Sequence, residues 1–228
     1  SGFNLVEAVI LPYLNYHSIN QLDKVIISHS DNDHAGGLSI LRKKIIIHEV
    51  IVNDHTIRES EDHFCLSGQS FKWQGLNFQQ LWPEKNQGEN NDDSCVIRIS
   101  DGLHSILLTG DISAKVEKLL VNKTKDNMVT LHSNVLIAAH HGSKSSSSIE
   151  FIKQVAPTAV IFSAGFLNRW SMPTELVKQR FINNKITIHS TNEHGMIRVN
   201  ISDKKLDILQ YRRDLSPYWF VNSKRKFN

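Results

Sequence analysis

The stretch that decides the fold is Val25-Ile26-Ile27-Ser28-His29-Ser30-Asp31-Asn32-Asp33-His34-Ala35-Gly36-Gly37, where a short apolar run ends in side chains of the metal-ligand type. The apolar run predicts a buried strand. Beyond its end, alternate residues point to one side, so His29, Asp31 and Asp33 can converge. His34 can join them if the chain turns at once into a helix, and the two glycines permit that close approach. We predict a metal site here; the alternative is a polar loop that caps the helix.

Two further strand ends carry side chains of the same kind. Asp111 follows Ile106-Leu107-Leu108-Thr109-Gly110, and the pair His140-His141 follows the apolar run 135–139. Because adjacent residues of a strand point in opposite directions, we expect one histidine as a direct ligand. The other would reach the substrate or support the site. The alternatives are a helix cap for Asp111, and one buried and one exposed histidine for the pair.

The remaining pattern alternates strands and helices, with antiparallel hairpins inserted. Two mixed sheets covered by helices explain this order better than a doubly wound sheet. Helices are predicted at 5–19 (kinked at Pro12), 36–43, 113–121 (capped by Ser113), 147–154 and 174–182, and strands at 24–28, 49–52, 69–82 (two strands joined near Gln74-Gly75), 94–99, 105–109, 135–139, 158–163, 186–189, 196–201 and 206–211. Residues 55–67 are ambiguous, and 83–93 are predicted to be a loop.

Length and composition set wide limits on function. The 228 residues suit one large α/β domain or two small ones, and the chain begins at Ser1, as a fragment or processed product would. The net charge of +3 and the pI of about 8.8 permit contact with polyanions without requiring it. Cys65 and Cys95 lack zinc-ligand spacing; one disulfide is possible, which leaves the redox compartment open. No run of about 18 apolar residues predicts a membrane span.

Taken together, the three strand-end motifs resemble the metallo-β-lactamase superfamily. Within it they are similar to the C-terminal β-lactamase-like domain of the ComEC family of DNA-uptake competence proteins. The stretches 9–14, 91–98 and 157–170 also resemble that family, and the likeness runs from Ser1 to Ile201. It implies an αβ/βα sandwich whose first strands lie upstream of Ser1 or are missing. We expect a domain at 1–211 and a basic tail at 212–228, with Lys224-Arg225-Lys226 a disordered end.

The resemblance also implies two divalent metal ions and a ligand set. His29 and Asp31 would serve one ion, Asp33, His34 and a histidine of the pair the other, and Asp111 would bridge them. The predicted ligands are His29, Asp31, Asp33, His34, Asp111 and His141. Three carboxylates and no thiolate favour Mn²⁺, with Zn²⁺ as the alternative. A seventh ligand is missing; Asn91, Asp92, Ser94 or water would fill its place, so the half built on His29 and Asp31 is the weaker.

The predicted reaction is attack on phosphorus by a hydroxide that two metals share. The predicted catalytic residues are Asp33, His140 and Lys144, and the predicted substrate-binding residues are Ser143, Ser145 and Arg169. Ser147 and Ser148 are better explained as caps of the next helix. A path for a single DNA strand would be lined by Lys144, Arg169, Trp170, Arg198, Arg212 and Arg213. The alternative is that these side chains simply form a solvated face. The histidine that the family usually carries near Met172-Pro173 is absent, so its role is not transferred.

By the resemblance, this domain would be the nuclease that degrades the DNA strand not transported during natural transformation. Its partners would be DNA and the membrane-channel part of the same parent chain, and the isolated domain would be monomeric. It would lie on the outer face of the inner membrane, in the periplasm of a double-membrane cell. Two alternatives stay open: a hydrolase of a small phosphodiester, lactone or acyl compound, and a non-enzymatic DNA-binding module with a decayed metal site.

Overall fold

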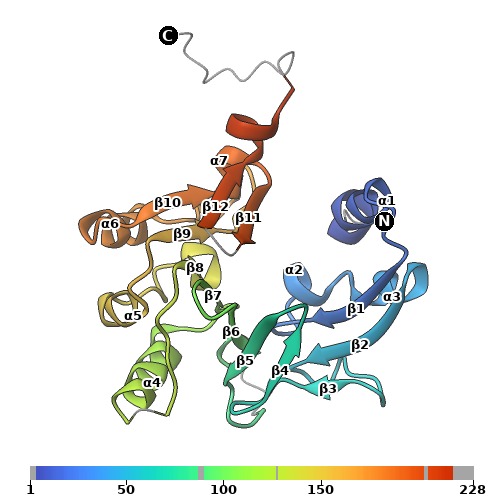
Figure 1. The fold of residues 1–228 in the computed structure, drawn as a ribbon, viewed down its shortest axis with the longest axis horizontal. Coiled ribbons are helices and arrows are strands. Elements are labelled where there is room, and N and C mark those ends of the chain that lie inside the picture. Colours follow the sequence, from blue (N-terminus) through green and yellow to red (C-terminus); the bar gives the residue numbers. More distant parts are fainter. Residues whose placement is uncertain (1–3, 87–89, 127, 203–204, 218–228) are drawn as a thin grey trace.

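The apolar run before His29 forms strand β1, Gln21–Ile26, which pairs in parallel with β2, Ile46–Val52. The computed structural model describes residues 4–86, 90–126, 128–202 and 205–217 (Figure 1). Within them, one sheet has the order β1-β2-β3, a larger one runs β10-β9-β8-β7-β6-β5-β4, and β11 and β12 form a hairpin. The other strands are His63–Phe64 (β3), Ser70–Trp73 (β4), Leu76–Trp82 (β5), Val96–Ser100 (β6), Ser105–Leu108 (β7), Val135–Ile137 (β8), Ala159–Phe162 (β9), Thr187–Ser190 (β10), Ile197–Ser202 (β11) and Lys205–Gln210 (β12).

Helices cover the outer faces of both sheets (Figure 1). Apolar side chains of α4, α5 and α6 pack on the large sheet, and those of η1, α1 and α3 pack on β1 and β2. The two sheets meet through a cluster that joins Ile26 and Ile51 to Phe71, Phe78 and Ile97. The helical segments are Val6–Ile10 (η1), Leu11–Tyr16 (α1), Asn32–Ala35 (α2), Leu38–Lys44 (α3), Asn90–Asp93 (η2), Ala114–Lys125 (α4), Ala139–Gly142 (η3), Ile149–Val155 (α5), Glu175–Asn183 (α6), Thr191–His194 (α7) and Tyr211–Leu215 (η4).

This layering confirms the predicted αβ/βα sandwich. The large sheet is mixed, because β7 to β10 pair in parallel and β4 to β7 pair antiparallel. The small sheet is parallel where the structure describes it, which differs from the two mixed sheets expected. In that part of the chain β1 pairs on its β2 side only. No helix of the described residues is long and apolar enough to cross a membrane.

Several predicted boundaries were wrong for identifiable reasons. The helix expected at 36–43 begins at Leu38 instead, as α3, and a separate short helix, α2, precedes it and ends before Gly36. An added Cβ would clash with the Asn32 carbonyl at Gly36 and with the Val6 side chain at Gly37, so packing requires glycine at both positions. Tyr211 begins η4 rather than ending a strand. The predicted caps Ser113 and Ser148 do accept backbone N–H groups of α4 and α5. The stretch 224–226 lies outside the described residues.

Cys65 and Cys95 form a disulfide that joins the segment after β3 to the residue before β6. Both half-cystines are buried, between the two sheets. The Cys95 N–H donates to the carbonyl of Ser28, two residues beyond the end of β1. The bridge therefore lies directly behind the segment that carries His29.

Candidate metal centre

Three loops bring the candidate ligands to one edge of the sandwich. Residues 29–34 leave β1 and enter α2, Asp111 follows β7, and η3 follows β8. Since β7 and β8 are adjacent parallel strands, their carboxyl ends lie at the same edge of the sheet. The cluster is therefore assembled where strands end, as the three motifs predicted.

Four of the predicted ligands surround a common point. His34 Nε2 lies 3.3 Å from Asp111 Oδ1 and 3.3 Å from His141 Nε2. His141 Nε2 lies 3.2 Å from Asp33 Oδ2 and 3.4 Å from Asp111 Oδ2. Two sets have ligand atoms close enough to share an ion, and His34 belongs to both: His29 with His34 and Asp111, and Asp33 with His34 and His141.

The imidazole of His29 gives the clearest indication that this cluster binds a cation. The His29 side chain is 1% exposed, and no hydrogen-bonding group of the described residues reaches its Nε2. Its Nδ1 is close to the hydroxyls of Ser28 and Ser94, at 3.0 and 3.3 Å. Burial, then the neighbouring His34, lower the pKa of His29, which favours the neutral imidazole that metals bind. A buried orphan nitrogen beside carboxylates fits a divalent cation.

Hydrogen bonds on the far side of the rings orient these nitrogens. The Nδ1 of His141 lies 2.6 Å from the carbonyl of Ser163, which can only accept, so Nδ1 carries the proton. That tautomer leaves the Nε2 lone pair of His141 facing the cluster. The Ser28 hydroxyl also lies 3.1 Å from Nδ1 of His34. Two of the three rings thus share Ser28 as a support.

Asp111 is the buried carboxylate of the centre. Burial raises its pKa, but the bond to His34 and the charges of His141 and His34 outweigh that and hold the pKa below its ordinary value. For His34, burial lowers the pKa, while the Asp111 bond and the nearby carboxylates raise it overall. The two groups therefore stabilise each other's charged form.

The half of the centre around Asp31 is looser. Asp31 is partly exposed, and its Oδ2 lies 3.6 Å from His29 Nε2. Two of the residues considered for a seventh ligand are used elsewhere: the Asp92 carboxylate accepts the Ser113 N–H, and the Ser94 hydroxyl accepts the Asp111 N–H. Ser94 is a support for Asp111 and His29 in this arrangement rather than a ligand.

The histidine pair does not continue the strand, contrary to expectation. β8 ends at Ile137, and His140 and His141 lie in η3 with φ of 50° and 54°. Such left-handed values are uncommon outside glycine and cluster at functional sites. Because of this turn both rings face the same region, with His140 Nε2 3.9 Å from Asp111 Oδ2.

The loop after η3 carries three of the other predicted residues, Ser143, Lys144 and Ser145. Ser145 Oγ lies 3.3 Å from His140 Nδ1 and 3.0 Å from Ser143 Oγ, while Lys144 is exposed between them. Arg169 is exposed in the loop after β9, with its guanidinium 4.0 Å from the centre of the Trp170 ring. That loop continues from Ser163, which supports His141.

Sequence reasoning missed three supports. Ser28 stands directly before the motif, and its position was the one available signal. Ser163 acts through its backbone carbonyl, which no sequence pattern reveals. Glu117, on α4, accepts the N–H groups of Ser147 and Ser148 and so holds the loop after η3. Nothing in the sequence separates Glu117 from an ordinary surface acid of an amphipathic helix.

Known proteins match both the motif and the fold. The family described as "Metallo-beta-lactamase superfamily" matches residues 2–165. This chain belongs to that superfamily. Its members are generally metal-dependent hydrolases, and the ligands at the strand ends fit that class.

Curated relatives confirm the likeness to competence proteins. The chain is 39% identical to Recombination protein 2 of Haemophilus influenzae, covering 96% of this chain and 27% of that protein. It is 33% identical to Competence protein ComA of Neisseria gonorrhoeae (92% and 30%), and 30% identical to ComE operon protein 3 of Bacillus subtilis (89% and 27%). The chain thus spans 27 to 30% of the length of these relatives.

Solved structures agree on the fold. The metallo-beta-lactamase fold protein YhfI of Bacillus subtilis superposes with a TM-score of 0.52 at 13% identity, covering 83% of this chain and 81% of that one. The CmlA beta-hydroxylase gives a TM-score of 0.53 at 12% identity over 75% of this chain and 43% of that one. At such identities the likeness concerns architecture alone.

Proposed function

We propose that this domain is a divalent-metal-dependent phosphodiesterase that cleaves DNA, and that its substrate is the strand not transported during DNA uptake. The observation that carries the proposal is the convergence of His29, His34 and Asp111, in which the buried His29 Nε2 has no hydrogen-bonding partner among the described residues. The names of the relatives, competence and recombination proteins, favour DNA as the substrate.

The metals would be held by the six predicted ligands, His29, Asp31, Asp33, His34, Asp111 and His141. Divalent ions there would polarise a phosphoryl oxygen and lower the pKa of a water molecule. Without a bound cation, the negative charges of Asp31, Asp33 and Asp111 at this edge of the sandwich would repel a phosphate group. These carboxylates therefore favour a hard cation, and we propose Mn²⁺ with Zn²⁺ as the alternative.

His140 is placed to move a proton. If the Ser145 hydroxyl donates to Nδ1, the ring proton resides on Nε2, which faces Asp111. From that atom it can be donated to the leaving oxygen of a phosphodiester. Ser143 and Ser145 would offer hydroxyls to the phosphate, and Lys144 and Arg169 would offer positive charge from the exposed loops after η3 and β9.

The disulfide supports a location outside the cytosol. Disulfides persist in oxidising compartments and are rare in the reducing cytosol. Cys65 and Cys95 are bridged directly behind the loop of His29. We place the domain on the outer face of the membrane, attached to a channel in its parent chain.

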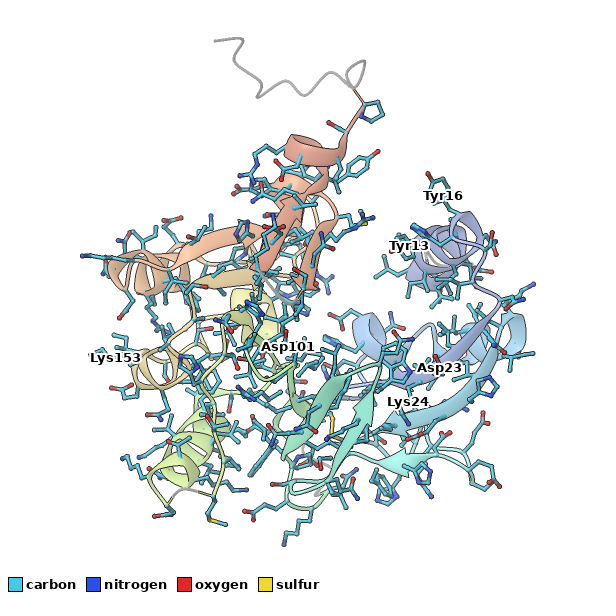
Figure 2. The ribbon with its side chains drawn as sticks, viewed as in Figure 1. Tyr13, Tyr16, Asp23, Lys24, Asp101 and Lys153 are labelled. Atoms are coloured by element: carbon cyan, nitrogen blue, oxygen red, sulfur yellow. A yellow bond between two sulfur atoms is a disulfide. The ribbon has the colours of Figure 1, made fainter. Side chains whose placement is uncertain are left out.

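The test is cleavage of labelled single-stranded DNA by the purified chain in Mn²⁺, compared with Asp33→Ala. Asp23→Ala is the matched control, since Asp23 is an exposed acid of β1 (Figure 2). We expect cleavage by the wild type and the control only, with Zn²⁺ supporting less. A folded, metal-loaded wild type that leaves DNA intact would refute the proposal. So would hydrolysis of a small phosphodiester that competitor DNA does not inhibit.

A further inference from the structure

A cleft of about 710 Å³ lies between the N-terminal helix and the C-terminal hairpin, outside the metal centre. This volume is within the range of ligand sites in proteins, roughly 300–1,000 Å³. Its lining is mainly aromatic: Tyr13, Tyr16 and His17 on one wall, and Met196, Arg198, Tyr211 and Leu215 on the other.

The first wall is an exposed aromatic cluster at the end of α1. Tyr13 and Tyr16 project from this helix (Figure 2), and their side chains are 43% and 84% exposed. The His17 ring lies 4.5 Å from that of Tyr13 and 5.0 Å from that of Tyr16. Spacings of three and four residues place these rings on one side of a helix. Leu14, between them, is buried in the core, so the aromatic side is not needed for packing.

The second wall adds positive charge to apolar surface. Arg198 lies on β11, and Tyr211 begins η4, with its N–H donated to the Met196 carbonyl. Beside it, the guanidinium of Arg212 lies 5.7 Å from the centre of the Phe166 ring, in the exposed loop after β9. Among the described residues that line the cleft, none is acidic.

Hydrogen bonds link the elements of both walls to segments close to the candidate ligands. On the α1 side, the Asn4 amide donates to the Gly36 carbonyl, just after His34. On the hairpin side, the Thr191 hydroxyl donates to the Ala164 carbonyl, next to the Ser163 that supports His141. A ligand in the cleft would therefore be fixed relative to the metal centre.

We propose that this cleft binds unpaired nucleobases of a single-stranded polynucleotide, a role that rests on the proposed phosphodiesterase function. Every base has a π-face that stacks on tyrosine, and Arg198 offers its charge to the backbone phosphates. A duplex hides its base faces in its own stack, so it gains little from exposed tyrosines. The cleft thus selects strands whose bases are already unpaired.

The experiment measures binding without catalysis. The 228-residue chain is freed of metal with a chelator and titrated into a labelled oligonucleotide of about 20 thymidines. This length exceeds the ~4–16 nucleotides that one OB-fold, a common single-strand-binding domain, occupies. Tyr13→Leu and Tyr211→Leu should each weaken binding on the order of tenfold, since each removes a ring on which a base can stack. Trp73→Leu, which alters an exposed ring at the end of β4, is the matched control and should bind as the wild type does.

Conservative variants separate stacking from damage to the fold. Tyr13→Phe and Tyr211→Phe keep the ring and should retain binding. An abasic oligonucleotide of equal length should bind the wild type at least as weakly as thymidines bind either leucine variant, because it can stack on none of the rings. The salt dependence should not change in those variants, because the phosphate contacts remain.

The inference is overturned if the leucine variants bind like the wild type, or if duplex DNA binds as tightly as single strands. It is also overturned if the wild type binds vesicles of anionic lipid instead and the leucine variants lose that binding. Because metal is absent throughout, these results do not depend on cleavage. A chain that cleaves nothing can still bind bases here, and a chain that binds no bases can still be a phosphodiesterase.

Discussion

The two loops that hold most of the candidate ligands reach the same centre in different ways. The loop of His29 to His34 is organised by its own neighbours in sequence. Ser28 supports both histidines, and the Asp31 carbonyl accepts the N–H groups of His34 and Ala35 as α2 begins. Six residues and the strand before them therefore contain most of the information for this half.

The loop of His140 and His141 depends on distant helices. Its left-handed turn is followed by Ser147, also left-handed, whose N–H donates to the buried carboxylate of Glu117 on α4. Arg180 of α6 donates to the carbonyls of Ser146 and Ser147 at 2.8 and 2.9 Å. Uncommon backbone angles cost free energy and persist only when such contacts over-determine them.

This difference between the two loops predicts which substitutions will disturb each of them. Changes close in sequence should damage the first loop, whereas changes on α4 or α6 should damage the second without touching a ligand. Four predictions test this comparison.

The largest effect is expected for His34→Ala. His34 belongs to both candidate ligand sets, so its loss should reduce metal binding and DNA cleavage together. The reduction should exceed the roughly 100-fold typical of removing a partner behind a ligand. Metal content and cleavage rate are the measurements, and His48→Ala is the control, since His48 is an exposed residue of β2 that lies near Gln21 of β1. Equal activity in both variants would exclude a shared role for His34.

Ser28→Ala should have the next largest effect. It removes the hydroxyl that orients His29 and His34, and such losses cost about 10–100-fold in metal affinity or activity. Ser30→Ala is a close control, because its hydroxyl donates to Asp54 instead. Isothermal titration with Mn²⁺ would measure both. If the control loses more affinity than Ser28→Ala, the first loop is not organised as described.

Glu117→Gln should destabilise the second loop. An amide offers one oxygen to the two backbone N–H groups that the carboxylate accepts, so one buried donor loses its partner. That loss costs about 1–3 kcal/mol. Urea unfolding would show it, against Glu150→Gln at an exposed position of α5. Unchanged stability would mean that α4 does not hold this loop.

The smallest effect concerns pH. Burial raises the pKa of Glu117 above its ordinary value, although the bonds from Ser148 and Ser147 and the charge of Arg180 act in the opposite direction. Between the unfolded and the raised folded pKa, the folded protein keeps a proton that the unfolded chain has released. The free energy of unfolding therefore falls as pH rises through this window and levels off above the folded pKa.

Glu117→Gln lacks that titration, so the stability of the wild type relative to the variant should fall as pH rises through the window. Urea unfolding of both metal-free proteins across that window is the measurement. An advantage that is constant, or that grows with pH, contradicts the raised pKa.

Much of the fold could be read from local patterns. The hairpin of β4 and β5 turns at Gln74-Gly75 as predicted, and Ser113 caps α4 through its hydroxyl. The helix boundary at Gly36-Gly37 could not be read, because Gly37 is required by its contact with Val6, which lies far away in the sequence, while Gly36 is required by Asn32 of α2. The disulfide was only one possibility in the sequence, since Cys65 and Cys95 come together through the packing of two sheets.

By itself, the sequence determined which side chains meet at the strand ends and the superfamily to which they belong. A ligand motif confined to six residues after a buried strand needs little beyond local geometry to converge. The tertiary structure alone decided how His140 and His141 turn, which carbonyl fixes the tautomer of His141, and how a carboxylate on α4 holds their loop. Those outcomes depend on contacts between residues far apart in the chain, where spacing in the sequence carries no information about distance.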